Sequence, residues 1–122
     1  MKKDLTQEEI PVWVVDDDEV RYSIRFALAT HGIDARTYAS GEDFFNLVET
    51  DQPGCLVVDL TMPGMSGIDL AKRLRGAGCR AEIIFITSHF ECMAEGYEVD
   101  ALHYLVKPVP AEKLRAVLDR AA

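Results

Sequence analysis

The stretch Val12-Trp13-Val14-Val15-Asp16-Asp17-Asp18-Glu19 passes from four apolar residues directly into four acids. A short apolar run bounded by polar residues is typical of a strand that is buried on both faces of a sheet. Similar runs occupy residues 55–58, 83–86 and 102–106, and a weaker alternating run at 33–38 is typical of an edge strand. The sequence therefore predicts five short strands, the first of which ends at a group of carboxylates.

Amphipathic helical patterns separate the predicted strands. In the clearest, Val20, Ile24, Ala27 and Leu28 share one face, and Gly32 marks the end of the helix. A second pattern has Phe44, Leu47 and Val48 after a capping Ser40. A third has Leu70, Ala71 and Leu74 after Ser66 and Asp69, which have capping-box spacing. A weak pattern lies at 90–97, and the last consists of Leu114, Val117, Leu118 and Ala121. This alternation predicts an α/β protein with a parallel sheet and helices on both faces.

Polar side chains follow four of the predicted strands. They are Asp16 and Asp17 after the first, Asp59 after 55–58, Thr87 after 83–86, and Lys107 with Pro108 after 102–106. The carboxyl ends of parallel strands lie at one edge of the sheet, where α/β folds place their functional sites. We therefore expect these residues to converge there.

The expected cluster combines carboxylates with a hydroxyl and a lysine. Carboxylates a few ångströms apart repel each other unless a cation offsets them. Oxygen ligands without Cys or His favour Mg²⁺, which together with a lysine and a hydroxyl can hold the oxygens of a phosphoryl group. A carboxylate facing such a group can act as a nucleophile and form an aspartyl-phosphate, and Asp59 is the candidate.

These motifs resemble those of a response-regulator receiver domain of bacterial two-component signalling. The resemblance rests on Val14-Val15-Asp16-Asp17, Asp59-x-x-Met62-Pro63-Gly64-Met65-Ser66-Gly67, Thr87 and Lys107-Pro108, and it covers residues 11–118. It implies a flavodoxin-like (βα)5 doubly wound sandwich, with a five-stranded parallel sheet of order 2-1-3-4-5 and helices on both faces. We expect one receiver domain over residues 1–122, with 1–10 a polar leader and no effector domain in this chain.

The resemblance also implies a role for each site residue. Asp59 corresponds to the phosphoacceptor, Asp17 to the direct Mg²⁺ ligand, Asp16 to the acid that holds the metal through water, and Thr61 to the residue whose backbone carbonyl binds the metal. Thr87 corresponds to the hydroxyl that meets the phosphoryl group, Lys107 to the lysine that pairs with a phosphoryl oxygen, Pro108 to a cis-proline, and Tyr104 to the aromatic that becomes buried as Thr87 moves.

The function implied is that of a phosphorylation-controlled switch. The phosphohistidine of a sensor histidine kinase gives its phosphoryl group to Asp59, and the change repacks the surface of the fourth helix, fifth strand and fifth helix. That surface would bind a second copy, an output domain or a partner protein. Because such a domain catalyses chemistry only on itself, we do not expect an enzyme.

The sequence departs from the commonest receiver pattern in three places. The segment between Asp17 and the first helix is one residue shorter, so Asp17 and Asp18 are an alternative to Asp16 and Asp17 as the metal-facing pair. Ser88 and His89 follow Thr87, where a small residue is frequent. The part up to Leu74 resembles receivers with helix-turn-helix outputs, whereas residues 96–105 resemble those with LytTR-type outputs.

Two other functions remain as alternatives. A haloacid-dehalogenase-type phosphohydrolase would use Asp16 as the nucleophile and Asp18 as the acid, and would leave Asp59 and the segment after it unexplained. A phosphate-independent interaction module on the same fold would have no need for the acids, Thr87 and Lys107.

Composition limits the partners. The formal net charge is −8 and the pI about 4.8, which argues against direct nucleic-acid binding by this domain and against a polybasic membrane anchor. No apolar run approaches the length of a membrane helix, and the polar N-terminus favours a cytoplasmic location. The three cysteines (Cys55, Cys79, Cys92) and three histidines (His31, His89, His103) have no metal-ligand spacing.

Overall fold

The computed structural model describes residues 11–16, 19–47, 53–60, 62, 64–87, 103–107 and 109–121. Its elements are, in order, β1 (Val12–Val15), α2 (Val20–Ala29), β2 (Ala35–Tyr38), α3 (Gly41–Leu47), β3 (Cys55–Asp59), α4 (Gly67–Gly76), β4 (Glu82–Thr87), β5 (His103–Val106) and α5 (Ala111–Ala121). The five strands are parallel and their order is β2-β1-β3-β4-β5. The predicted fold is confirmed, and the helix expected at 90–97 lies outside the described residues.

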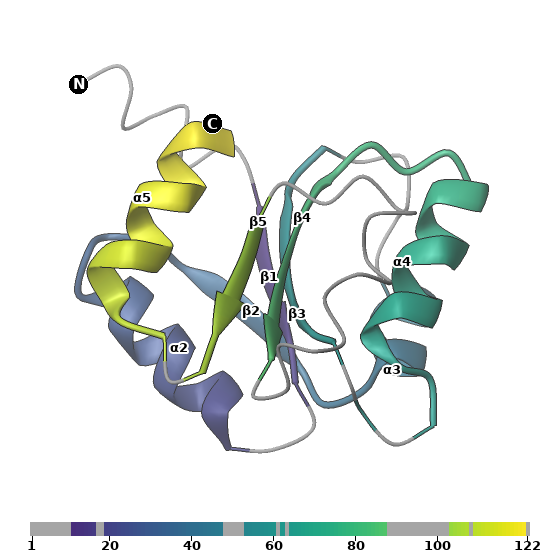
Figure 1. Ribbon diagram of the computed structural model, residues 1–122, viewed down its shortest axis with the longest axis horizontal. Helices are drawn as coiled ribbons and strands as arrows, with labels where there is room; N and C mark the ends of the chain where they lie inside the picture. The colour runs from purple at the N-terminus through teal and green to yellow at the C-terminus, as the bar shows by residue number, and fades with distance from the viewer. Residues whose placement is uncertain are drawn as a thin grey trace.

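The sheet is covered on both faces by helices. Helices α2 and α5 lie on one side of it and α3 and α4 on the other (Figure 1). Side chains alternate between the two faces: Trp13 and Val15 pack toward α3 and α4, while Val12 and Val14 pack toward α2 and α5. β1 is buried along its whole length, which explains its uninterrupted apolar sequence.

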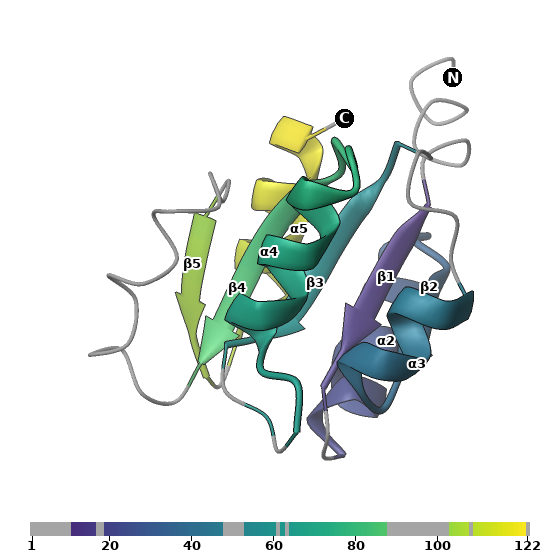
Figure 2. The ribbon, with the colours of Figure 1, turned by 90° about the vertical axis from the view of Figure 1, so that its right-hand side faces the viewer.

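The ends of β1 and β3 lie next to each other at the carboxyl edge of the sheet. β1 pairs in parallel with β2 on one side and with β3 on the other, and the arrows of β1, β3, β4 and β5 point the same way (Figure 2). The chain leaves β1 toward α2 on one face and leaves β3 toward α4 on the opposite face. This divergence opens the sheet edge between Asp16, which follows β1, and Asp59, the last residue of β3.

The predicted helix boundaries are also confirmed where they are described. The Oγ atoms of Ser40 and Ser66 accept hydrogen bonds of 3.1 Å from the backbone amides of Asp43 and Asp69, capping α3 and α4. Gly32 follows α2 with a φ of 81°, a conformation that glycine adopts without strain. Of the predicted inward residues of α3, Phe44 is buried, and the side chains of Leu47 and Val48 are outside the described part.

Two of the three cysteines lie in the core. Cys55 and Cys79 are buried, and Cys92 is outside the described residues. Burial, assisted by the nearby Glu82 carboxylate, raises the pKa of Cys55 to about 12. The Cys55 thiol therefore stays protonated at neutral pH and packs as a small apolar side chain.

Candidate functional site

Two acids and a lysine from three strands meet at the carboxyl edge of the sheet. The Nζ atom of Lys107 lies 3.0 Å from Oδ2 of Asp16 and 2.9 Å from Oδ2 of Asp59. Lys107 and Asp59 are 48 positions apart in the sequence. The predicted convergence of these three residues is confirmed by their contacts.

The sheet's alternation places all three side chains on one face. Asp16 follows Val14 by two residues, Asp59 follows Val57, and Lys107 follows Leu105; Val14, Val57 and Leu105 all pack toward α2 and α5. The backbone amide of Asp16 donates to the carbonyl of Tyr38 at 3.1 Å and that of Lys107 to the carbonyl of Thr87 at 2.9 Å. Backbone pairing therefore continues past β1 and β5 and fixes both residues.

The site is buried and has an excess of negative charge. Asp16 has no exposed surface and Asp59 is 5% exposed. Burial alone would lower the pKa of Lys107, but the hydrogen bonds and negative charges of Asp59 and Asp16 outweigh that effect and raise the pKa above its usual value. Two carboxylates face one ammonium, so the pair of acids keeps a net charge that a further cation would offset.

Thr87 and Tyr104 lie on the opposite face of the sheet. Thr87 is completely buried at the end of β4. Tyr104 pairs with Phe85 in the sheet register, and their rings are stacked with centroids 5.6 Å apart. Since Thr87 is two residues beyond Phe85, the hydroxyl and the Tyr104 ring belong to the same face of neighbouring strands.

The sequence model of a protein family, the response regulator receiver domain, matches residues 12–119 of this chain. The chain belongs to this family. It is 32% identical over 112 residues to the DNA-binding transcriptional regulator NtrC of Klebsiella pneumoniae, with 89% of this chain and 24% of that protein covered. It is 34% identical over 122 residues to the transcriptional regulatory protein FixJ of Azorhizobium caulinodans, with 94% and 58% covered.

Solved structures agree with this assignment. The crystal structure of FixJ-N has a TM-score of 0.84 and 30% sequence identity, and the match covers 92% of both chains. The chain spans about a quarter of NtrC and 58% of FixJ. Receiver domains are the phosphoacceptors of two-component signalling, and this is the function of the family to which the chain belongs.

Several residues predicted for the receiver site lie outside the described part of the chain. They are Asp17, Thr61 and Pro108, together with Ser88 and His89. Among the described residues, no group of three or more acids, histidines or cysteines lies close enough together to hold a metal ion. The oxygen donors of Asp16 and Asp59 nevertheless have the chemistry that Mg²⁺ prefers, so the residues present fit this ion.

Two residues near the receiver site make contacts that were not predicted: Arg21 was not singled out from the sequence, and Gly67 was quoted only as part of the motif after Asp59. Arg21 donates from Nη1 to the backbone carbonyl of Asp16 at 3.1 Å. The backbone of Gly67 lies against the carbonyl of Asp59, and its amide donates to the carbonyl of Leu60 at 3.0 Å. Both contacts involve backbone carbonyls, for which the side-chain pattern of a sequence carries no signal.

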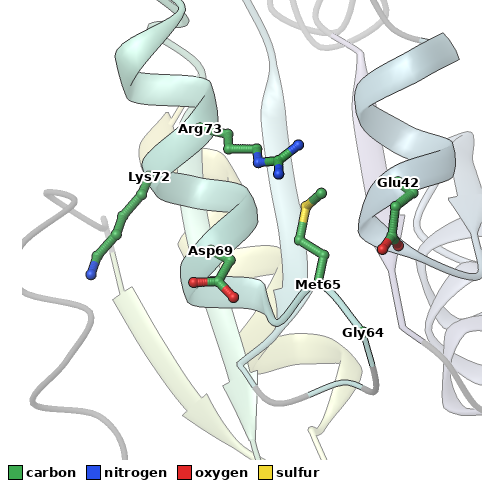
Figure 3. Close-up of a pocket in the computed structure, with 6 residues that line it drawn as sticks. All are labelled: Glu42, Gly64, Met65, Asp69, Lys72 and Arg73. Carbon is green, nitrogen blue, oxygen red and sulfur yellow. The ribbon is translucent and has the colours of Figure 1, made fainter.

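Two hollows flank the receiver fold near this edge. One, of about 340 Å³, lies between α2 and α5 and includes Lys107 in a lining that is otherwise mostly apolar. A second, of about 510 Å³, lies between α3 and α4; Met65 and Arg73 extend into it, while Lys72 points away (Figure 3). None of the predicted site residues that the structure describes lines the second hollow.

Proposed function

We propose that this receiver domain takes a phosphoryl group onto Asp59 from the phosphohistidine of a sensor histidine kinase. A carboxylate oxygen of Asp59 attacks the phosphorus and forms a P–O bond as the P–N bond of phosphohistidine breaks. The electron pair of the P–N bond stays on the ring nitrogen that carried the phosphoryl group, and the histidine leaves as neutral imidazole with its proton on the other ring nitrogen. The observation that carries this proposal is the position of Lys107 Nζ, within 3.0 Å of two buried carboxylates.

The charge of the site supports a requirement for Mg²⁺. We assign the metal ligands to Asp17, Asp59 and the backbone carbonyl of Thr61, with Asp16 acting through water. When bound, the ion neutralises charge on the transferring phosphoryl oxygens. Among the described residues, two carboxylates share one ammonium, and the remaining negative charge favours the binding of such a cation.

Lys107 and Thr87 complete the set that meets the phosphoryl group. The ammonium of Lys107 contacts Oδ2 of Asp59, so it is close enough to pair with an oxygen of a phosphoryl group carried on that side chain. We assign the remaining contact to the hydroxyl of Thr87.

The output is a change of surface. Phosphorylation draws Thr87 toward Asp59 and lets Tyr104 move on the same face of the sheet, which shifts a two-state population. We propose that the affected surface is formed by β5 and α5 together with the helix predicted at 90–97, which lies outside the described residues. Its described part has a half-exposed Val106 and a hollow of about 260 Å³ lined by Tyr104, Val106 and Pro110 among others. We propose that a second copy, an output domain or a partner protein binds here.

The domain catalyses its own phosphorylation and slow dephosphorylation and does not turn over a separate substrate. Asp16, the nucleophile of the hydrolase alternative, is fully buried, whereas Asp59 retains some exposure. Family membership favours signalling, and steady turnover of a generic phosphomonoester would be needed to support the alternative.

No described helix has the length and apolar character of a membrane span. The cytoplasmic location stays a prediction from the sequence.

The test is labelling by a small phosphodonor, with and without Mg²⁺, of the wild type and Asp59→Asn. We expect one label per chain in the wild type, none in Asp59→Asn, and none without metal. Asp43→Asn, which changes an exposed acid of α3, is the matched control and should label normally. Label that persists in Asp59→Asn, or that ignores removal of the metal, would overturn the proposal.

A further inference from the structure

Arg21 reaches back from the first turn of α2 to the end of β1. Its Nη1 donates a hydrogen bond of 3.1 Å to the backbone carbonyl of Asp16, in a partly buried position. That carbonyl belongs to the peptide group that joins Asp16 to Asp17. A charged donor forms a stronger hydrogen bond than a neutral one, so this contact constrains the orientation of that peptide group.

The neighbouring Tyr22 holds the guanidinium in place. Nη2 of Arg21 donates to the hydroxyl of Tyr22 at 3.1 Å, and the guanidinium carbon lies 4.5 Å from the centroid of the Tyr22 ring. These contacts restrict the rotamers of a long side chain, which lowers the entropy lost in the bond to Asp16. Arg21 is therefore pre-oriented toward the end of β1.

Asp16 is held at three points by three different elements. Its amide donates to the carbonyl of Tyr38 in β2, and its carboxylate contacts Lys107. Its carbonyl accepts from Arg21 of α2. Among the contacts of the described residues, the bond from Arg21 is the one made to the peptide group that follows Asp16.

We propose that Arg21 is a positioning residue for the acid pair: by fixing the peptide between Asp16 and Asp17 it sets the direction of the carboxylates and so the affinity for Mg²⁺. The inference rests on the proposed function, because it needs this pair to bind the metal. Groups that orient metal ligands from outside the coordination shell commonly change metal affinity by about tenfold or more.

The test compares Arg21→Met with Arg25→Met. Both remove one positive charge from α2, and methionine matches arginine in helix propensity, so helix stability and long-range charge are affected alike. Arg25 is exposed one turn further along the helix. Three quantities are measured: the Mg²⁺ affinity by calorimetry, the rate of labelling by a small phosphodonor at saturating Mg²⁺, and amide exchange in metal-free protein at Asp17, whose N–H belongs to the peptide group that Arg21 contacts.

We expect Arg21→Met to weaken Mg²⁺ binding by about tenfold and to speed amide exchange at Asp17, with labelling at saturating Mg²⁺ changed by less than about threefold. Arg25→Met should leave all three within about twofold. Arg21→Lys should recover part of the affinity, because lysine keeps a charged donor without the fork that also reaches Tyr22. If Arg21→Met fails to fold, Arg21→Lys decides: an affinity equal to that of the wild type would overturn the inference.

Two results contradict the inference and one contradicts the function beneath it. Equal changes in Arg21→Met and Arg25→Met would show that only charge matters. An unchanged affinity in Arg21→Met would show that the contact does not position the acids. A wild-type protein that binds no Mg²⁺ would instead overturn the proposed function.

Discussion

The backbone of Gly67 lies so close to the carbonyl of Asp59 that a Cβ atom at position 67 would overlap the carbonyl oxygen. Gly67 is the first residue of α4 and Asp59 the last of β3, so the helix begins in direct contact with the strand that carries the phosphoacceptor. The contact is with backbone, which cannot move aside as a flexible side chain can. The φ of Gly67 is not positive, so the backbone conformation does not require glycine at this position. Glycine is required because it has no Cβ atom and so allows the close approach to Asp59.

Substitution of Gly67 by alanine should therefore displace Asp59. We expect Gly67→Ala to lower the free energy of unfolding by about 2–3 kcal/mol, as overpacking does, and to slow phosphodonor labelling by at least about tenfold. Unfolding in urea can be followed by the fluorescence of Trp13, the single tryptophan.

Gly76 provides a matched control at the other end of α4. A Cβ atom there meets nothing within 4 Å. Gly76→Ala should raise stability by about 0.5–1 kcal/mol and leave labelling unchanged. Equal effects of the two substitutions would mean that the contact with Asp59 has no special importance.

Removal of the Lys107 ammonium should separate metal binding from phosphoryl transfer. In Lys107→Met, Asp16 and Asp59 lose the cation that they share, and we expect metal-free stability to fall by about 3 kcal/mol. Mg²⁺ should then bind more tightly than to the wild type, because the competing ammonium is gone. Labelling should nevertheless slow by at least about tenfold, since a group that stabilises the transferring oxygens is missing.

Calorimetric titration with Mg²⁺ and phosphodonor labelling measure these opposite effects. Lys113→Met, an exposed substitution on α5, is the control for loss of one charge and should change neither. Weaker Mg²⁺ binding in Lys107→Met would show that the lysine supports the metal site and does not compete with it.

The pH dependence of stability should show the pairing of Lys107 at alkaline pH. Burial lowers the pKa of Lys107, but the hydrogen bonds and negative charges of Asp59 and Asp16 outweigh it and raise the pKa in the folded protein above its usual value of 10.5. The stability that the ion pairs supply is thus complete below pH 10.5 and is lost as the pH rises through the folded-state pKa. The difference in unfolding free energy between the wild type and Lys107→Met, measured in urea from pH 8 upward, should be flat and then fall. A difference that grows in this range would contradict the pairing.

Much of the sheet was predictable because its central strands are apolar throughout. The first strand was predicted at 12–15 and observed there, as β1. Polar residues hid the ends of others: β3 includes Asp59 and β4 runs from Glu82 to Thr87. Their backbones pair with neighbouring strands whatever their side chains are. β2 begins at Ala35, not 33, because β1 provides partners only from Val12 onward.

The sequence predicted which edge of the sheet carries the site residues, but not how their side chains contact one another there. Strand ends predicted that Asp16, Asp59 and Lys107 converge, because parallel strands share an edge. The pairing of Lys107 with a phosphoryl oxygen was predicted, whereas the contact of its one ammonium with both acids was not. That contact depends on the relative placement of β1, β3 and β5, which side-chain spacing along one chain does not encode.

The coupling between Thr87 and Tyr104 is tested by removing the hydroxyl that starts the movement. Thr87→Ala should still accept label on Asp59 but lose the phosphorylation-dependent change in association, because Tyr104 no longer receives space from a moving side chain. Thr87→Ser, which retains the hydroxyl, is the matched control and should respond almost normally. Sedimentation of phosphorylated and unphosphorylated protein measures association.

Since the Tyr104 ring is stacked on Phe85, two residues before Thr87 in β4, Tyr104→Ala should abolish the same response without affecting labelling. A normal response in Thr87→Ala would show that the signal reaches β5 by another route.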